Sequence, residues 1–164
     1  MKLAILSDTH DHIWRVDSIL PQLAEVDAIL HCGDLCSPFL LRKLAAGVQG
    51  KPIHVVWGNN DGDRQLLTVA AAEAGNVYLH GDFADLTLGG VRIALTHYPQ
   101  VARAVAQSGA YDLVCYGHDH RLHQETLGRT LLLNPGELFG GLTGRSTYAL
   151  YHTESRKAVI LDVP

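Results

Sequence analysis

Seven side chains that can bind metal ions stand in short motifs spread along the sequence. Each follows directly on an apolar run that predicts a β-strand. In an open α/β sheet, ligands bind beyond the carboxyl ends of the strands, so side chains from separate loops can share one crevice. The seven residues are Asp8, His10, Asp34, Asn59, His97, His118 and His120.

The spacing within two of the motifs supports a shared target. Residues two apart in an extended backbone project to the same side, which would let Asp8 act with His10 and His118 act with His120. The set combines carboxylates, imidazoles and one amide oxygen. That mixture suits Mn²⁺, Fe, Zn²⁺ or Ni²⁺ rather than Ca²⁺.

A glycine stands just before three of the motif residues. Glycine permits tight turns and close backbone approach, so loops that contain it can turn their side chains inward. The three positions are Gly33, Gly58 and Gly117.

The first half of the chain predicts three successive strand-loop-helix units. Strands are expected at residues 2–6, 28–31 and 53–57, and helices at residues 13–23, 39–46 and 63–74. Strands that are apolar almost throughout are typical of parallel sheets with helices on their faces. The class is therefore α/β.

The second half predicts mostly antiparallel strands. A hairpin is expected at residues 82–95, a helix at 98–108, and further strands at 113–116, 122–126, 130–133, 147–151 and 159–163. Glycine and asparagine turns separate them. The expected architecture is two packed β-sheets flanked by helices in a single domain, residues 1–164.

The motifs resemble those of the calcineurin-like metallophosphoesterase superfamily, and within it the small phosphodiesterases of the YfcE type. That superfamily has the order D-x-H, GD, GN-x-D/E, H and GH-x-H. The matching segments are Asp8-Thr9-His10, Gly33-Asp34, Gly58-Asn59-Asn60-Asp61, His97 and Gly117-His118-Asp119-His120. The ordered set covers nearly the whole chain and implies the calcineurin-like sandwich fold.

The resemblance also implies a division of labour within a dinuclear metal site. Asp8, His10 and His120 would bind one metal, Asn59, His97 and His118 the other, and Asp34 would bridge them. Two divalent ions are implied, manganese first, with nickel, iron or zinc as alternatives. Such a pair hydrolyses a phosphate ester by in-line attack of a bridging hydroxide.

Two positions depart from the commonest family pattern. Asn60 stands where many members have a histidine that assists the leaving group, and an amide donates no proton at neutral pH. Small YfcE-like members also lack that histidine, and the change favours good leaving groups. Asp61 is expected to orient a ligand or its loop. Glu137 follows an NPG turn, at a position where the family often has serine, so the match to the family's turn near the site ends at Glu137.

Bulk properties limit the partners. The chain has 164 residues, a net charge of −4 and a 47% hydrophobic composition. This charge argues against nucleic acid or anionic membranes as partners, so we expect a small phosphate-ester substrate. The first residues predict neither a secretory core nor a membrane span, and three cysteines are an odd number, so a cytoplasmic protein is expected. A homodimer or homotetramer is compatible with the sequence.

Several alternatives remain open at this stage. The superfamily includes Vps29, a retromer subunit that uses the fold chiefly as an interaction scaffold, and it includes phosphomonoesterases and protein phosphatases. His12 could face solvent or substrate, and Trp57 could pack in the core or face substrate. Arg145 could touch phosphate. Cys32 and Cys36 could bind metal, although packing is favoured for these two cysteines.

Overall fold

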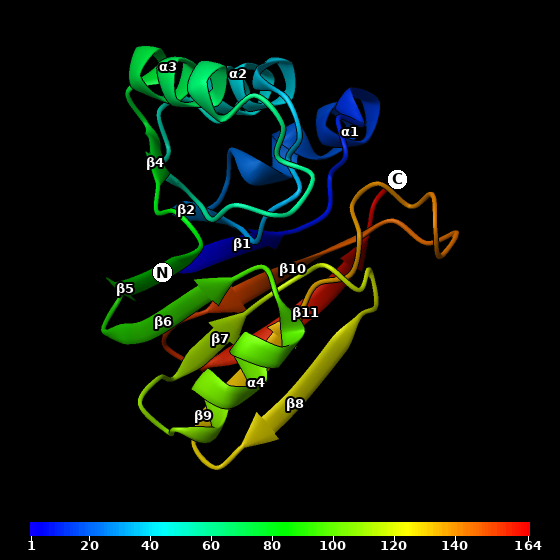
Figure 1. Ribbon diagram of the computed structural model, residues 1–164. Coiled ribbons are helices and arrows are strands. Elements are labelled where there is room, and N and C mark those ends of the chain that lie inside the picture. Colours follow the sequence, from blue (N-terminus) through cyan, green and yellow to red (C-terminus); the bar gives the residue numbers. More distant parts are fainter.

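The computed structural model describes residues 1–164, which form four helices and eleven strands (Figure 1). The helices are α1 (Ile13–Leu23), α2 (Pro38–Gly47), α3 (Arg64–Ala74) and α4 (Pro99–Gln107). The strands are β1 (Lys2–Leu6), β2 (Ala28–His31), β3 (Ile53–Val55), β4 (Val77–Leu79), β5 (Phe83–Leu88), β6 (Val91–Thr96), β7 (Leu113–Cys115), β8 (His123–Leu127), β9 (Thr130–Asn134), β10 (Thr147–His152) and β11 (Lys157–Asp162).

The strands form two sheets that pack face to face. The six-stranded sheet has the order β11-β10-β1-β2-β3-β4, in which β1 to β4 are parallel and β10 and β11 form an antiparallel extension. The five-stranded sheet has the order β5-β6-β7-β9-β8, with a parallel centre and antiparallel edges. Figure 1 shows α1, α2 and α3 over the larger sheet and α4 over the smaller one. The predicted architecture of two packed sheets flanked by helices is confirmed.

Three apolar layers hold the sandwich together. One lies between the larger sheet and α1–α3, and it includes Leu6, Ile19 and Leu44. The second fills the space between the sheets, around Ile5 and Leu95. The third joins α4 to the smaller sheet. Strands β1 and β2 contribute to two layers at once, which explains their continuous apolar runs.

Local signals set the ends of the helices. The Asp63 side chain accepts a hydrogen bond from the Leu66 backbone N–H at the start of α3, and Gly75 ends that helix in a left-handed conformation. Pro38 and Pro99 begin α2 and α4, where the missing N–H of proline is not needed. None of the helices has the length and apolar character required to cross a membrane.

Two features of the fold differ from the sequence-based expectation. Strand β4 was not predicted, and its Tyr78 side chain is exposed, so the strand lacks a clean apolar run. The second half is antiparallel in its hairpins and at β10, but β7 pairs in parallel with both β6 and β9. The helix α4 between β6 and β7 makes the crossover that a parallel pair requires.

His54 in β3 and His80, directly after β4, form a pair that generates a pH-dependent prediction. His54 Nδ1 lies 3.0 Å from His80 Nε2, and the His54 ring stacks on Tyr78. Burial, together with the neighbouring His80, lowers the pKa of His54 to about 4. In the unfolded chain this pKa returns to roughly 6.5. Between pH about 4 and about 6.5 the unfolded chain therefore binds more protons than the folded one. The contribution of neutral His54 to the unfolding free energy is fully present above pH about 6.5 and is lost as the pH falls toward about 4.

Replacing His54 with glutamine should reduce this acid sensitivity. Urea unfolding of the protein and of His54→Gln, at about pH 7.5 and about pH 5, measures the loss of unfolding free energy for each. We expect a smaller loss in the variant. An equal loss in both proteins would contradict the role assigned to His54.

Candidate metal centre

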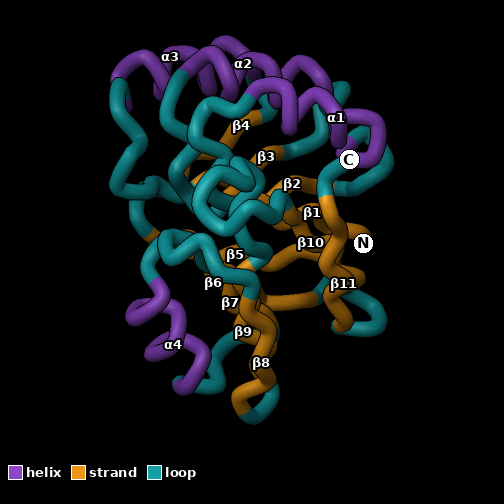
Figure 2. Tube along the Cα trace, turned by 90° about the vertical axis from the view of Figure 1, so that its right-hand side faces the viewer, coloured by secondary structure: helices purple, strands orange, loops and turns teal.

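The two sheets bring the seven predicted side chains to one edge of the molecule. Asp8, Asp34 and Asn59 follow β1, β2 and β3 of the larger sheet, whereas His97 and His118 follow β6 and β7 of the smaller one. In Figure 2 the loops gather on the face turned to the viewer, between the α1–α3 layer and the smaller sheet. The site therefore spans the junction of the sheets.

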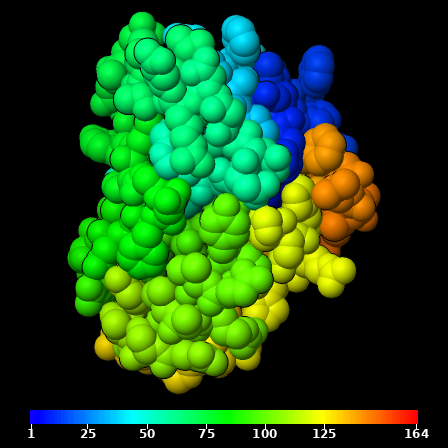
Figure 3. Space-filling model, viewed as in Figure 1, coloured from blue at the N-terminus to red at the C-terminus, as the bar shows by residue number.

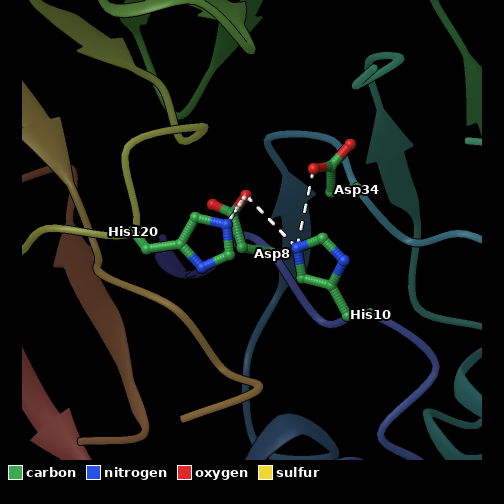
Figure 4. A group of neighbouring side chains, drawn as sticks. All are labelled: Asp8, His10, Asp34 and His120. Carbon is green, nitrogen blue, oxygen red and sulfur yellow. Dashed lines mark ion pairs between the residues drawn. The ribbon is translucent and has the colours of Figure 1, made fainter. Parts of the chain in front are cut away.

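Four of the residues form a compact group. Asp8, His10, Asp34 and His120 each offer one ligand atom, and these atoms lie within 4.8 Å of one another. The His10 Nε2 atom is 3.9 Å from Asp8 Oδ1 and 3.6 Å from Asp34 Oδ2, and His120 Nε2 is 3.5 Å from Asp8 Oδ1. Figure 4 shows the His10 ring nitrogen facing both carboxylates. The spacing leaves room for a cation among the four.

The other three predicted residues form a second group beside the first. Asn59 Oδ1 lies 3.0 Å from His97 Nε2 and 2.9 Å from His118 Nδ1. The same His97 Nε2 is 3.5 Å from Asp34 Oδ2. The Oδ2 atom of Asp34 therefore faces a histidine of each group, which is the position that a bridging ligand requires.

Hydrogen bonds orient two of the imidazoles. His97 Nδ1 donates to the Cys32 backbone carbonyl over 2.8 Å, and His120 Nδ1 donates to Glu137 Oε2 over 2.6 Å. In each neutral ring the proton is then on Nδ1, so Nε2 presents its lone pair to a carboxylate oxygen. Two acceptors that face each other repel unless a cation or proton lies between them.

The backbone of the site is left-handed at five of the seven positions. The φ angles are 51° at Asp8, 42° at His10, 57° at Asp34, 75° at His118 and 60° at His120. The sequence-based explanation that the paired motifs are extended is therefore wrong, because left-handed turns aim these side chains. Such a conformation costs roughly 1–2 kcal/mol per residue.

Two glycines allow the loops to approach one another. A Cβ at Gly58 would overlap Asp34 Oδ1, and one at Gly117 would overlap Ser7 Oγ. Neither Cβ could be accommodated without movement of the neighbours. The glycines before Asn59 and His118 therefore provide close backbone approach, as expected from the sequence.

Asn60 and Asp61 fix the loop that carries Asp34. The Asn60 backbone N–H and Nδ2 donate to the two carboxylate oxygens of Asp34, each over 2.8 Å. The buried Asp61 carboxylate accepts hydrogen bonds from the backbone N–H groups of Asp34, Cys36 and Gly58 at 3.2, 2.7 and 2.6 Å. These contacts join the loops after β2 and β3.

Glu137 is the site residue whose contacts the sequence did not reveal. Its carboxylate is fully buried, accepts from His120 Nδ1, and accepts from the Thr143 backbone N–H and Oγ1 at 2.6 and 2.7 Å. The Leu142 backbone N–H donates to it over 3.0 Å. Burial opposes ionisation, but the hydrogen bonds from Thr143 and His120 outweigh it and lower the pKa of Glu137. The carboxylate therefore orients His120 and holds residues 138–145 in place.

Burial dominates the electrostatics of the site. It raises the pKa of Asp8 to about 7, which Ser7 and His120 oppose and the nearby Asp34 carboxylate reinforces. Burial also lowers the pKa of His10 and of His97, so their neutral forms are favoured. Neutral imidazoles beside buried carboxylates are the chemical form in which such side chains bind cations.

The residues left open by the sequence lie around this centre. His12 Nδ1 accepts from the Arg15 backbone N–H at the start of α1, and Arg145 pairs with Asp162. Trp57 packs against the core, and the guanidinium carbon of Arg64 lies over its ring, 5.3 Å from the ring centroid. Cys36 Sγ is 3.6 Å from His10 Nδ1, the nitrogen that faces away from the carboxylates.

The buried Cys32 belongs to the layer between the sheets, and all three cysteines are free. His31 is also fully buried, with its Nε2 3.2 Å from Thr9 Oγ1.

Comparison with known proteins gives a consistent result. The model of the calcineurin-like phosphoesterase superfamily domain matches residues 1–156. The phosphodiesterase MJ0936 of Methanocaldococcus jannaschii is 32% identical over 161 residues, which cover 96% of each chain. A solved structure of a novel archaeal phosphodiesterase superposes with a TM-score of 0.91 at 30% identity and covers 99% of each chain.

More distant structures share the fold alone. YfcE, a phosphoesterase from E. coli, has a TM-score of 0.70 at 21% identity, with both chains covered in full. Vps29 from Entamoeba histolytica has a TM-score of 0.69 at 19% identity, again with full coverage of both chains. At these identities neither similarity assigns an activity.

The contacts of Glu137 generate a prediction about the loop of residues 138–145. Glu137→Gln keeps the size of the side chain but removes its charge and one acceptor. We expect the unfolding free energy to fall by about 1–3 kcal/mol, because buried hydrogen-bonding groups lose their partner. Urea unfolding measures this change, and hydrogen exchange should show faster exchange at the Leu142 and Thr143 amides.

Glu73→Gln is the matched control. Glu73 is an exposed glutamate on α3 whose contact is an ion pair with Arg42, and such pairs contribute about 0–1 kcal/mol. Equal stability changes in the two variants, with unaltered exchange at residues 142 and 143, would contradict the role given to Glu137.

Proposed function

The chain belongs to the calcineurin-like phosphoesterase superfamily, and on that premise we propose that it is a phosphodiesterase that works with two divalent metal ions. Manganese is the ion we favour, with nickel, iron or zinc as alternatives. Asp8, His10 and His120 form the first ligand set, Asn59, His97 and His118 form the second, and Asp34 belongs to both.

One observation carries this proposal: nitrogen lone pairs and carboxylate oxygens face one another across the site. His10 Nε2 is buried and has no hydrogen-bond partner. His97 Nε2 and His120 Nε2 face Asp34 Oδ2 and Asp8 Oδ1 over 3.5 Å each. A buried ring nitrogen without a partner is unfavourable, and ring nitrogens whose lone pairs face carboxylate oxygens repel them, whereas bound cations would satisfy both. The residues present therefore fit the implied metals.

The chain itself positions the chemistry. When bound, a pair of divalent ions polarises the phosphoryl group and supplies the nucleophile for an in-line displacement. Asp34 is held ready for both ions by Asn60, whose two donors fix its carboxylate. The hydrogen bonds to Cys32 and Glu137 keep His97 and His120 in the ligand tautomer.

Asn60 shapes the substrate preference that we propose. Its amide donates to Asp34 and offers no proton to a leaving oxygen. A missing general acid reduces turnover of poor leaving groups by roughly 10²- to 10⁴-fold. We therefore propose esters with good leaving groups, and diesters over monoesters. The similarity to MJ0936, which is named a phosphodiesterase, supports this class.

The partners follow from charge. A net charge of −4 favours a small phosphate ester over nucleic acid. Free Cys32, Cys36 and Cys115 are compatible with a reducing compartment, and we propose the cytoplasm. We also propose that the chain can associate as a homodimer or homotetramer. A scaffold without catalysis, like Vps29, is the alternative, and the similarity to Vps29 concerns the fold alone.

Metal removal tests the activity directly. The protein is stripped with a chelator, reloaded with Mn²⁺, Ni²⁺ or Zn²⁺, and assayed on bis(4-nitrophenyl) phosphate and 4-nitrophenyl phosphate. We expect no turnover without metal, recovery with Mn²⁺, and a higher kcat/KM for the diester. Absence of turnover with every metal would support the scaffold alternative, and turnover of the monoester alone would overturn the substrate class.

Asp34→Asn tests the ligand that both sets share, and His118→Gln tests the second set alone. Both should lose metal affinity, measured by titration calorimetry, and should reduce kcat/KM by about 10²-fold or more. His118 is exposed, so its replacement should leave the fold unchanged even if Asp34→Asn is unstable. Asp82→Asn, an exposed carboxylate in the β4–β5 turn, is the control. Activity in His118→Gln equal to that of the control would refute the second set.

A further inference from the structure

A row of aromatic rings leads from the metal centre to the surface. The rings of His10 and His120 stack with their centroids 5.0 Å apart, and Phe139 meets His10 edge-on at 5.6 Å. Phe139 is 5.9 Å from His12, and His12 is 5.8 Å from Trp14. The row therefore begins at two proposed ligands and ends outside the centre.

Trp14 leaves most of its ring in solvent. Its side chain is 76% exposed, although tryptophan is highly buried on average. The other tryptophan, Trp57, packs against the core and is covered by Arg64. Trp14 lies in the first turn of α1, directly after the loop that carries His10. An open indole face thus lies at the outer end of the row of rings that starts at His10.

His12 adds a polar group to this surface. Its Nδ1 accepts a hydrogen bond from the Arg15 backbone N–H over 3.4 Å. The proton of the neutral ring is then on Nε2, which is free to donate. The surface therefore combines ring faces for stacking with a donor for an acceptor atom on a bound ring.

The surface is fixed to the same backbone that positions the ligands. The Phe139 backbone N–H donates to the Asp8 carbonyl over 3.0 Å. Asp11 Oδ1 accepts from the Ser37 backbone N–H and Oγ at 3.1 and 2.5 Å, which ties the start of α1 to the start of α2. Figure 3 shows the N-terminal segment in blue, the segment around residue 140 in orange and the segment around residue 120 in yellow, adjoining one another on the right of the molecule.

We propose that Trp14, His12 and Phe139 form a subsite for a flat aromatic ring carried by the phosphate ester. This inference rests on the proposed phosphodiesterase function and names its substrate class: an ester in which at least one alcohol bears an aromatic ring with a hydrogen-bond acceptor. A nucleoside and a substituted phenol both have this chemistry. The ring stacks on Trp14 and accepts from His12 Nε2 while the phosphate lies at the metal centre.

Binding tests the subsite without turnover. Trp57→Phe leaves Trp14 as the single tryptophan, since the chain has two. The Zn²⁺-loaded variant is titrated with adenosine 5′-monophosphate, 4-nitrophenyl phosphate and methyl phosphate. We expect saturable quenching of Trp14 fluorescence by one or both ring-bearing monoesters and none by methyl phosphate. The stronger of the two identifies the nucleoside or the phenol as the source of the ring, and quenching by neither would overturn the proposal.

Kinetics separates the subsite from the activity itself. Thymidine 5′-(4-nitrophenyl phosphate), bis(4-nitrophenyl) phosphate and methyl 4-nitrophenyl phosphate share a leaving group. Trp14→Ala should lower kcat/KM by roughly 5- to 100-fold, the range of one ring stacked on an aromatic side chain, and mainly through KM. Trp14→Phe should restore most of the loss. If kcat/KM falls on all three substrates, the ring of the leaving 4-nitrophenol stacks on Trp14. If it falls only on the thymidine and bis(4-nitrophenyl) esters, the ring that stays on the phosphate stacks there.

Tyr78→Ala, which removes an exposed aromatic ring on β4, is the matched control and should leave kcat/KM unchanged. Normal turnover in Trp14→Ala on every substrate would refute the subsite while the phosphodiesterase function stands. If Trp14→Ala dissociates an oligomer on size-exclusion chromatography but keeps its kinetics, a second copy covers the surface and the proposal is wrong. No turnover in any protein would instead remove the function on which the inference rests.

Discussion

The position of the Asp34 carboxylate is the constraint on which the site depends. Its Oδ2 atom faces His10 and His97, which lie in loops that follow strands of different sheets. Its backbone carbonyl accepts from the N–H groups of Thr9 and His10, and its own N–H donates to Asp61. One residue thus connects the loops after β1, β2 and β3. A shift of Asp34 would disturb both ligand groups together.

The stability of the sandwich supports a costly arrangement at its edge. Five site residues have left-handed backbones, and the two carboxylates of Asp8 and Asp34 are buried beside each other. Burial is unfavourable for such groups unless they are paired. The apolar layers and the hydrogen bonds of Asp61 and Glu137 hold them in place. Strain and buried charge concentrated in one location are typical of sites that bind ions.

Much of the site could be predicted because it follows the ends of strands. The apolar runs before Asp8, Asp34 and His97 identify those ends, and parallel strands bring their carboxyl ends to the same edge. The parallel pairing of β6 and β7 was also open to prediction, since the helix after His97 is the crossover that such pairs need. Strand β4 has three residues and one exposed ring, which is too little for a periodic signal.

The contacts of Glu137 were beyond sequence reasoning for a different reason. The carboxylate meets the amides of residues 142 and 143 only because the loop folds back on itself, and no local pattern specifies that turn. The left-handed conformations of Asp8 and His10 likewise depend on the hydrogen bonds from residues 8 to 10 to the loop after β2. Tertiary structure decides both features.

The division of the site between two sheets has a consequence for the molecule as a whole. His118 meets the Asp8 carboxylate although 110 positions separate them in the chain. A cation bound by Asp8 and His120 would act as a reversible cross-link between the halves of the sandwich. Any ligand that binds only the folded state stabilises it by mass action. The concentration of metal in the surroundings would then set the temperature or denaturant concentration at which the protein unfolds, independently of any reaction that it catalyses.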